Sequence, residues 1–245
     1  MADNTTEMLT SEDEEDSLPL SVQLIAGLII IMVIFTALVG NVLTIAAFIR
    51  DKQLRVVYNI YIVNLAIADL LIACVSMPFY AVYTLTRYSW PFGYHFCKLY
   101  MVIDFTICLE SVLIVMILSY DRLLLIKQGT VYLQKETITR ASVKIAVSWV
   151  IAFLLYSPAI IGWDLWTGEN TNEERDCDVQ FAYDFGFTTA TAVCEFIIPF
   201  FVITILNSIL YKEIRKRRKI ISKTRPSKNS TEKNYVIKTK KHFRK

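Results

Sequence analysis

Five long apolar runs constrain this chain more than any other feature of its sequence. The first, residues 24–49, contains no charged side chain, and the later ones, about 57–85, 98–118, 141–162 and 185–211, contain few. A helix needs about 20 residues to cross the hydrocarbon core of a bilayer, so each run is long enough for one span. We therefore predict an all-α membrane protein, a transmembrane helical bundle with helices at about 22–49, 57–86, 94–127, 140–162 and 182–212.

The composition of the 245 residues agrees with this prediction, since 54% are hydrophobic and only 20% are charged. These values exclude an ordinary soluble enzyme and a disordered regulator, and five cysteines are too few for a disulfide-rich scaffold. The sequence also contains no GxxxxGK(S/T), HExxH, CxxC or GxSxG motif. We therefore predict that the protein is not an enzyme and that it has no catalytic residues, no metal site and no cofactor.

Basic residues follow the first, third and fifth apolar runs and are sparse in the other loops. They gather at 50–55, at 122–140 and in the tail 212–245, whereas the opposite loops contain Arg87 and Arg175. Loops that are rich in Lys and Arg stay in the cytoplasm, so this pattern predicts an N-terminus outside the cell and a tail inside it.

The two ends of the chain follow from that orientation. We predict an acidic extracellular N-terminus at 1–21, with a glycosylation sequon at Asn4, and a basic cytoplasmic segment at 213–245 that begins a third intracellular loop. The protein is expected in the plasma membrane. Because the basic segment follows a membrane span, we expect it to be attracted to membrane lipid and not to nucleic acid.

Carboxylates at membrane depth are the next unusual feature. The apolar runs contain Asp69, Asp104, Glu110 and Glu195. Each costs about 3 kcal/mol at the centre of a bilayer, so each is a candidate for a functional role, the alternative being a polar partner within the bundle or a place near the interface.

The third run places two charged sites on one helix face. Asp104, Cys108, Ser111, Val115 and Arg122 follow one another in steps of three or four residues, or in the last case their sum, so they share a face. Asp104 lies near the outer end, and Arg122 is about 27 Å further along, near the cytoplasmic end. One helix is therefore expected to present an anionic site outside and a cationic site inside.

The fifth run and the loop before it add two features near the outer surface. Glu195 lies one turn before Pro199, with Thr191 one turn further out on the same face. Cys97 begins the third helix outside, and Cys177 lies in the outer loop before the fifth helix. An oxidising exterior permits a disulfide between them, which would fold this loop over the helix ends; the alternative is two free thiols.

Short motifs in chain order resemble helices one to five of a rhodopsin-like G-protein-coupled receptor over about residues 20–211. They are Gly40-Asn41, the run Asn64-Leu65-Ala66-Ile67-Ala68-Asp69, Trp90-Pro91-Phe92-Gly93, Cys97, Ser119-Tyr120-Asp121-Arg122, Trp149, Pro158, Cys177 and Pro199. Asp104 with Cys108 resembles the amine-binding site of aminergic receptors. Glu195, four residues before Pro199, resembles the acid with which the third and fourth histamine receptor subtypes hold an imidazole.

The resemblance implies a biogenic amine as ligand, with histamine favoured, and a heterotrimeric G protein of the inhibitory class as partner. The expected ligand-binding residues are Asp104, Phe105, Cys108, Thr191, Glu195 and Phe196. The chemistry agrees, because a carboxylate in a partly dry pocket binds an ammonium group and a second carboxylate accepts from an imidazole N–H.

The resemblance also implies an internal sodium site and an ion-pair switch. Asp69 with Ser111 resembles the family's sodium pocket, in which an allosteric ion favours the resting state. Asp121 and Arg122 resemble the family's switch, a pair closed at rest whose freed arginine contacts the G protein. Glu110 has no counterpart in the family, and we expect it to be protonated or paired with a polar group of the second or fourth helix.

The chain ends at Lys245 without the further apolar runs that would form the family's sixth and seventh helices. We therefore expect the N-terminal part of a receptor, and we predict no histamine response in cells that express residues 1–245 alone. One alternative is a truncated product that associates with full-length receptors without signalling. Another is a small cation transporter that uses the membrane acids as a relay, which predicts internal repeats that the sequence does not show.

Overall fold

The computed structural model describes residues 20–86, 88–168 and 177–224, and nearly all of them form helices. Three long helices are continuous: α2 (Leu20–Arg50), α5 (Tyr94–Gln128) and α7 (Ile138–Thr167). The other two spanning helices, which we call rods like the first three, are each built from three segments. The second rod consists of α3 (Val57–Leu71), η2 (Ile72–Ser76) and α4 (Met77–Leu85). The fifth rod consists of α8 (Phe185–Ala192), η4 (Val193–Ile197) and α9 (Ile198–Thr224). Short helices connect the rods: η1 (Lys52–Leu54), α6 (Thr130–Lys135) and η3 (Gln180–Tyr183).

The segmented rods change their helical geometry just before a proline. The five-residue segments η2 and η4 are π-helical, and they precede Pro78 and Pro199. Proline has no N–H to donate and its ring collides with the preceding turn, so a locally wider helix accommodates it. Pro158, in contrast, lies inside α7, which is α-helical throughout.

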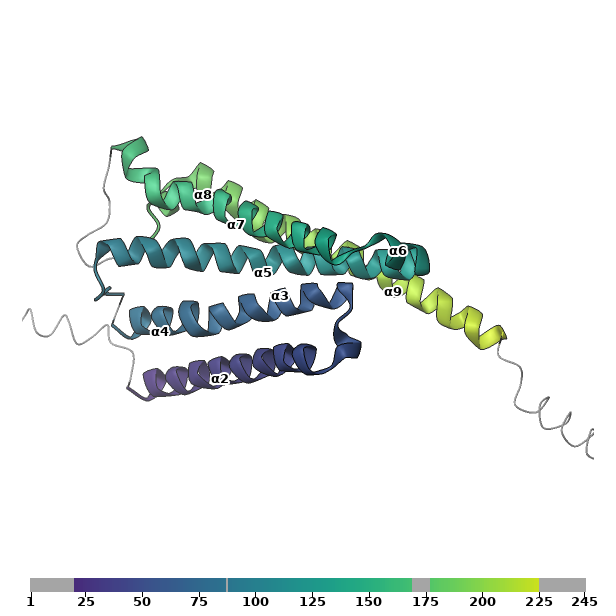
Figure 1. The fold of residues 1–245 in the computed structure, drawn as a ribbon. Coiled ribbons are helices and arrows are strands. Elements are labelled where there is room, and N and C mark those ends of the chain that lie inside the picture. The colour runs from purple at the N-terminus through teal and green to yellow at the C-terminus, as the bar shows by residue number, and fades with distance from the viewer. Residues whose placement is uncertain (1–19, 87, 169–176, 225–245) are drawn as a thin grey trace, which may run out of the picture.

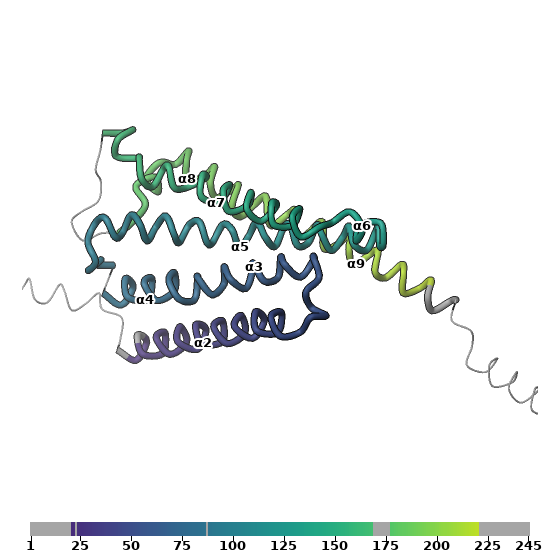
Figure 2. The backbone as a smooth tube through the Cα atoms, in the orientation of Figure 1, coloured from purple at the N-terminus to yellow at the C-terminus, as the bar shows by residue number. Residues whose placement is uncertain are grey.

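The rods pack side by side around α5, which lies between α3 and α7 (Figure 1). The backbone tube shows α2 on the outer side of α3, and α9 crossing α5 and running on past it (Figure 2). The side of α7 that is buried in the bundle contains small residues, namely Ala141, Ser148, Ala152, Ser157 and Ala159. Small side chains let two helix backbones approach closely, which is how helices pack inside membranes.

Large apolar side chains cover the outside of the bundle. On α2, Leu24, Leu28 and Met32 are all about three-fifths or more exposed, and the same pattern continues around α7 and α9. In water such surfaces would aggregate, but in a bilayer they face lipid tails. Five helices of the described residues are long and apolar enough to cross a membrane, which confirms the predicted all-α membrane bundle.

Two helix ends differ from the predicted boundaries. α7 continues to Thr167 and stops at Gly168, whose φ of 73° is the left-handed geometry that glycine adopts most readily. α9 continues to Thr224, so the first part of the predicted basic loop is helical. An Arg217 guanidinium donates to the Ile126 carbonyl and ties this basic extension to the end of α5. The rest of the predicted loop, and the predicted N-terminal segment with Asn4, lie outside the described residues.

Glu110 is the centre of a polar cluster that joins three rods. Its side chain is fully buried, and Oε1 accepts from Asn64 Nδ2 of α3 at 2.9 Å and from Ser148 Oγ of α7 at 3.0 Å. Trp149 Nε1 donates to Asn64 Oδ1 at 3.1 Å and extends the cluster. Both partners of Glu110 lie on the second and fourth helices, which confirms the expected pairing with one of these two helices.

Loss of the Glu110 carboxyl group is expected to destabilise the bundle because Asn64 and Ser148 would keep buried donors without acceptors. Glu110→Ala should lower the free energy of unfolding by about 3 kcal/mol, and Glu110→Gln, which keeps an acceptor oxygen, by less than about 1 kcal/mol. Thermal unfolding in detergent micelles measures both variants, with the exposed Gln134→Ala as control. Equal shifts for the two Glu110 variants would contradict this interpretation.

Candidate functional site

A disulfide organises the end of the bundle at which α5 begins. Cys97 and Cys177 are bonded, with their Cα atoms 5.7 Å apart, which confirms the predicted pair. Both cysteines are buried against Trp90 and Tyr100. The bond fixes the loop over the ends of α5 and α7, where η3 inserts the buried ring of Phe181. We call this region the disulfide end.

Asp104 lies on α5 about two turns below the disulfide. It is half-buried, and its charge acts on Tyr100 one turn above it and on Cys108 one turn below it. The Tyr100 hydroxyl is already used, because it donates to the Ser76 carbonyl at 3.2 Å. Tyr100 therefore does not engage the Asp104 carboxylate, which lies beside the Ser76 side chain at the level of the bundle where the predicted amine site lies.

Glu195 lies in the π-helical segment η4 and faces α7. Its Oε2 accepts a hydrogen bond from the Tyr156 hydroxyl at 2.5 Å. Tyr156 is 1% exposed, and its ring packs on Phe105 at 4.9 Å between centroids and stacks on Phe181 at 6.1 Å. Tyr156 therefore holds one carboxylate oxygen of Glu195, and the rings of Tyr156, Phe105 and Phe181 form an aromatic wall beside it.

Cys108 lies near both Asp104 and Glu195. The charges of both Asp104 and Glu195 act on its thiol, so the two carboxylates border one region between α5 and the fifth rod. Of the other predicted contacts, Phe105 borders this region through Tyr156. The structure thus brings Glu195 of the fifth rod to Asp104, Phe105 and Cys108, which lie together on α5.

The two remaining predicted ligand residues differ in their surroundings. The Thr191 hydroxyl is buried and donates to its own helix, at 2.9 Å from the Phe187 carbonyl and 3.0 Å from the Thr188 carbonyl, and it lies beside the Tyr156 hydroxyl. Phe196 is 71% exposed and stacks on Phe200 on the outside of the bundle. Phe196 directly follows Glu195 in the π-helical segment η4, so the two side chains leave the backbone in different directions. Among the described helices Phe196 does not border the region of Asp104 and Glu195, and its predicted ligand contact stays a prediction.

Asp69 and Ser111 lie on neighbouring helices deeper in the bundle. Both are half-buried, and the Ser111 hydroxyl oxygen has no hydrogen-bond partner among the described residues. Carboxylate and hydroxyl oxygens are ligands that hard cations prefer. Asp69 and Ser111 thus have the chemistry of cation ligands, and no group of three or more His, Cys, Asp or Glu side chains in the described part of the chain could form a metal site.

Asp121 and Arg122 do not form the closed pair that the sequence predicts. Within the described residues the two side chains make no ion pair with each other. Asp121, 2% exposed, instead accepts from the Tyr132 hydroxyl of α6, and the Arg122 guanidinium lies over the Tyr58 ring at 5.6 Å. Burial and this hydrogen bond raise the pKa of Tyr132, so the phenol remains a donor at neutral pH. The closed pair expected at rest is therefore not formed in this structure, in which Tyr132 engages one oxygen of the carboxylate.

Two residues of these sites were not predicted from the sequence as functional: Tyr132 and Tyr156. Tyr132 lies 11 residues after Asp121 and Tyr156 lies 39 residues before Glu195, and neither belongs to a recognisable short motif. A hydroxyl within an apolar helix was the only available signal for Tyr156, and that signal is common.

Comparison with known proteins decides the family. The profile of the 7 transmembrane receptor (rhodopsin family) group matches residues 40–243. The chain belongs to this rhodopsin family of receptors. The match covers most of the chain, including both acids of the disulfide end and the Asp121–Arg122 pair, and the family consists of receptors and not enzymes.

Curated relatives of this rhodopsin-family chain include muscarinic acetylcholine receptors. It is 37% identical over 182 residues to the M3 receptor of Sus scrofa, which is 74% of this chain and 31% of that protein. It is 36% identical over 195 residues to the M5 receptor of Macaca mulatta, which is 80% of this chain and 36% of that protein. The chain thus spans about a third of the length of these relatives. They support the rhodopsin family and give no support to the predicted histamine subtype.

Proposed function

We propose that the chain forms the amine-binding half of a plasma-membrane receptor of the rhodopsin family, with its N-terminus outside the cell. The single observation that supports an amine ligand best is the common region of Asp104 and Glu195 around Cys108. An ammonium group gains most from a carboxylate where water is partly excluded, and Asp104 is half-buried and not used by Tyr100.

Glu195 favours histamine among the biogenic amines. Tyr156 engages its Oε2, which leaves Oε1 to accept the N–H of an imidazole ring while Asp104 holds the ammonium end. Acetylcholine is the second candidate because the M3 and M5 relatives are acetylcholine receptors by name. Acetylcholine, a quaternary ammonium ester, has no N–H to donate to Glu195, so only histamine is expected to form a hydrogen bond with this residue.

Glu195→Gln distinguishes the two ligands. Within a complete seven-helix receptor that contains these residues, the substitution should lower histamine affinity about tenfold or more, because a hydrogen bond to a charged acceptor is lost. Acetylcholine affinity should remain within about twofold. Radioligand competition in cell membranes measures both. Unchanged histamine affinity would refute the imidazole contact, and tighter acetylcholine than histamine binding by the unaltered receptor would favour the second candidate.

Signalling is proposed to pass through a heterotrimeric G protein of the inhibitory class, for which the support is the resemblance of the Ser119-Tyr120-Asp121-Arg122 motif. A fall in cyclic AMP upon addition of histamine tests the coupling.

Asp69 and Ser111 are proposed to hold a sodium ion. The ion would neutralise the buried Asp69 and bridge α3 to α5, and the unpartnered Ser111 hydroxyl supports this assignment.

A further inference from the structure

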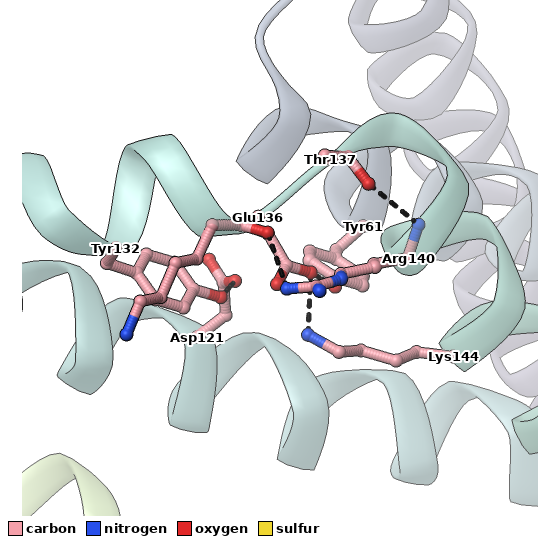
Figure 3. A network of polar contacts seen from close by, with 8 residues as sticks. Tyr61, Asp121, Tyr132, Glu136, Thr137, Arg140 and Lys144 are labelled. Atoms are coloured by element: carbon pink, nitrogen blue, oxygen red, sulfur yellow. Dashed lines mark hydrogen bonds and ion pairs between the residues drawn. The ribbon is translucent and has the colours of Figure 1, made fainter.

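Glu136 has no part in the proposed function so far, yet its carboxylate joins three elements at the end of the bundle opposite the disulfide. Its Oε1 accepts from the Tyr61 hydroxyl of α3 at 3.0 Å and from Lys144 Nζ of α7 at 2.6 Å. Figure 3 shows Glu136 at the centre of this group of side chains. The Glu136 side chain is only 9% exposed and Tyr61 is fully buried, so the contact is shielded from solvent.

Glu136 is also the residue at which α6 ends. Its backbone N–H donates to the Tyr132 carbonyl at 2.9 Å and closes the last turn. α6 has only six residues, and a helix of that length is not stable without tertiary contacts, because nucleating it costs more than its few hydrogen bonds return. The position of α6 must therefore be fixed by tertiary contacts between α6 and the rest of the bundle.

Packing against α3 does not fix α6. A cavity of about 440 Å³ lies between the two, lined by Arg55, Val56, Val57, Tyr58, Tyr132, Leu133 and Glu136. Most of the α6 side chains are exposed, with Tyr132 as its one buried residue. The links between α6 and the bundle are consequently mainly polar: the contacts of Tyr132 and Glu136, and a hydrogen bond from Arg140 Nη1 of α7 to the Lys135 carbonyl at 2.8 Å.

The contact of Tyr132 connects α6 to the Asp121–Arg122 pair. Tyr132, one turn before Glu136, donates to Asp121 Oδ1, while the buried Asp121 Oδ2 has no hydrogen-bond partner among the residues that the structure describes. A buried carboxylate with a free oxygen readily takes a guanidinium partner, and Arg122 is the next residue. As long as Tyr132 holds Asp121, Arg122 can lie over Tyr58 instead. If α6 moved away, Asp121 would be left to pair with Arg122.

We propose that Glu136 is a positioning residue for the receptor switch: by anchoring α6 to Tyr61 and Lys144 it holds Tyr132 on Asp121 and thereby keeps Arg122 free. The inference rests on the proposed function, since it assumes that free Arg122 favours contact with a G protein. It assigns to this loop carboxylate the control of which partner Asp121 takes.

The anchor is tested in the chain itself, reconstituted in lipid nanodiscs, by hydrogen exchange of the amides of 130–136. Glu136→Ala should speed exchange there about tenfold or more, because local opening becomes easier. Glu136→Gln, which keeps an acceptor for Tyr61 but loses the charge facing Lys144, should give a smaller increase. Gln134→Ala, an exposed change on the same helix, should have no effect. Exchange unaltered by Glu136→Ala overturns the proposal.

The link to the switch is tested by agonist-free nucleotide exchange on a G protein, with these residues in a complete seven-helix receptor. Glu136→Ala should reduce basal exchange about fivefold or more, and Tyr132→Phe should do the same. The double variant should be no lower than either single variant, because both act through Asp121. Additive losses or unaltered exchange in Glu136→Ala overturn the proposal, whereas absence of any G-protein response in the unaltered receptor refutes the proposed function itself.

Discussion

Replacing Asp104 with asparagine is expected to lower amine affinity at least about a hundredfold in a complete receptor that contains these residues. The substitution keeps the size of the side chain and removes the charge that faces the ammonium group. Removing one partner of a largely desolvated charge pair typically costs 2–5 kcal/mol, roughly 30-fold to several thousandfold in affinity. Radioligand saturation in cell membranes measures the change.

Asp164→Asn is the matched control for Asp104→Asn. Asp164 is also a carboxylate near the disulfide end, but it is paired with Lys98 Nζ at 2.6 Å and accepts from the Tyr94 hydroxyl at 2.6 Å. Neutralising it should leave amine affinity within about threefold, because the loss falls on a contact between α5 and α7 that is partly exposed. Equal losses for the two variants would show that net charge at this end, and not Asp104, attracts the ligand.

Removing the disulfide is expected to have the second large effect. Cys177→Ser releases the loop that joins residues 80 positions apart, and a cross-link over a loop of this length contributes about 4 kcal/mol in the chain-entropy account. Released, η3 would no longer hold Phe181 against Tyr156 and Phe105, which form the aromatic wall beside Glu195. We therefore expect both lower thermal stability and loss of ligand binding.

Cys194→Ser separates this effect from that of removing any thiol, because Cys194 is free and exposed on the fifth rod. It should change neither stability nor binding. Dithiothreitol should reproduce the Cys177→Ser result in the unaltered protein and do nothing further to the variant. Full binding in Cys177→Ser would mean that packing alone holds the loop over the site.

Much of the fold was predictable from local sequence. Apolar runs of membrane length gave five helices, since a segment in lipid must satisfy its own backbone hydrogen bonds. The disulfide was predictable because only Cys97 and Cys177 lie in the exterior parts of the predicted topology. The family was predictable from the ordered motifs, each of them short but all in register along the chain.

The surroundings of the key side chains were less predictable. Periodicity placed Glu195 and Thr191 on one face, yet the π-helical segment before Pro199 determines where each side chain points, and Phe196 turns outward as a result. Glu110 stood out as an unassigned acid, but its partners Asn64 and Ser148 come from two other helices. Such partners depend on how the helices are rotated about their axes, which no local pattern encodes.

The sequence by itself determined that residues 20–224 contain five helices able to cross a membrane, that Cys97 and Cys177 are able to pair, and that the chain belongs among rhodopsin-like receptors, because helix length, hydropathy and motif order are local properties. Only the tertiary structure decided that Tyr156 holds Glu195, that Glu110 joins three rods, and that Asp121 takes Tyr132 in place of Arg122. The physical reason is that a buried polar group takes whichever partner the packing of distant segments brings within hydrogen-bond distance.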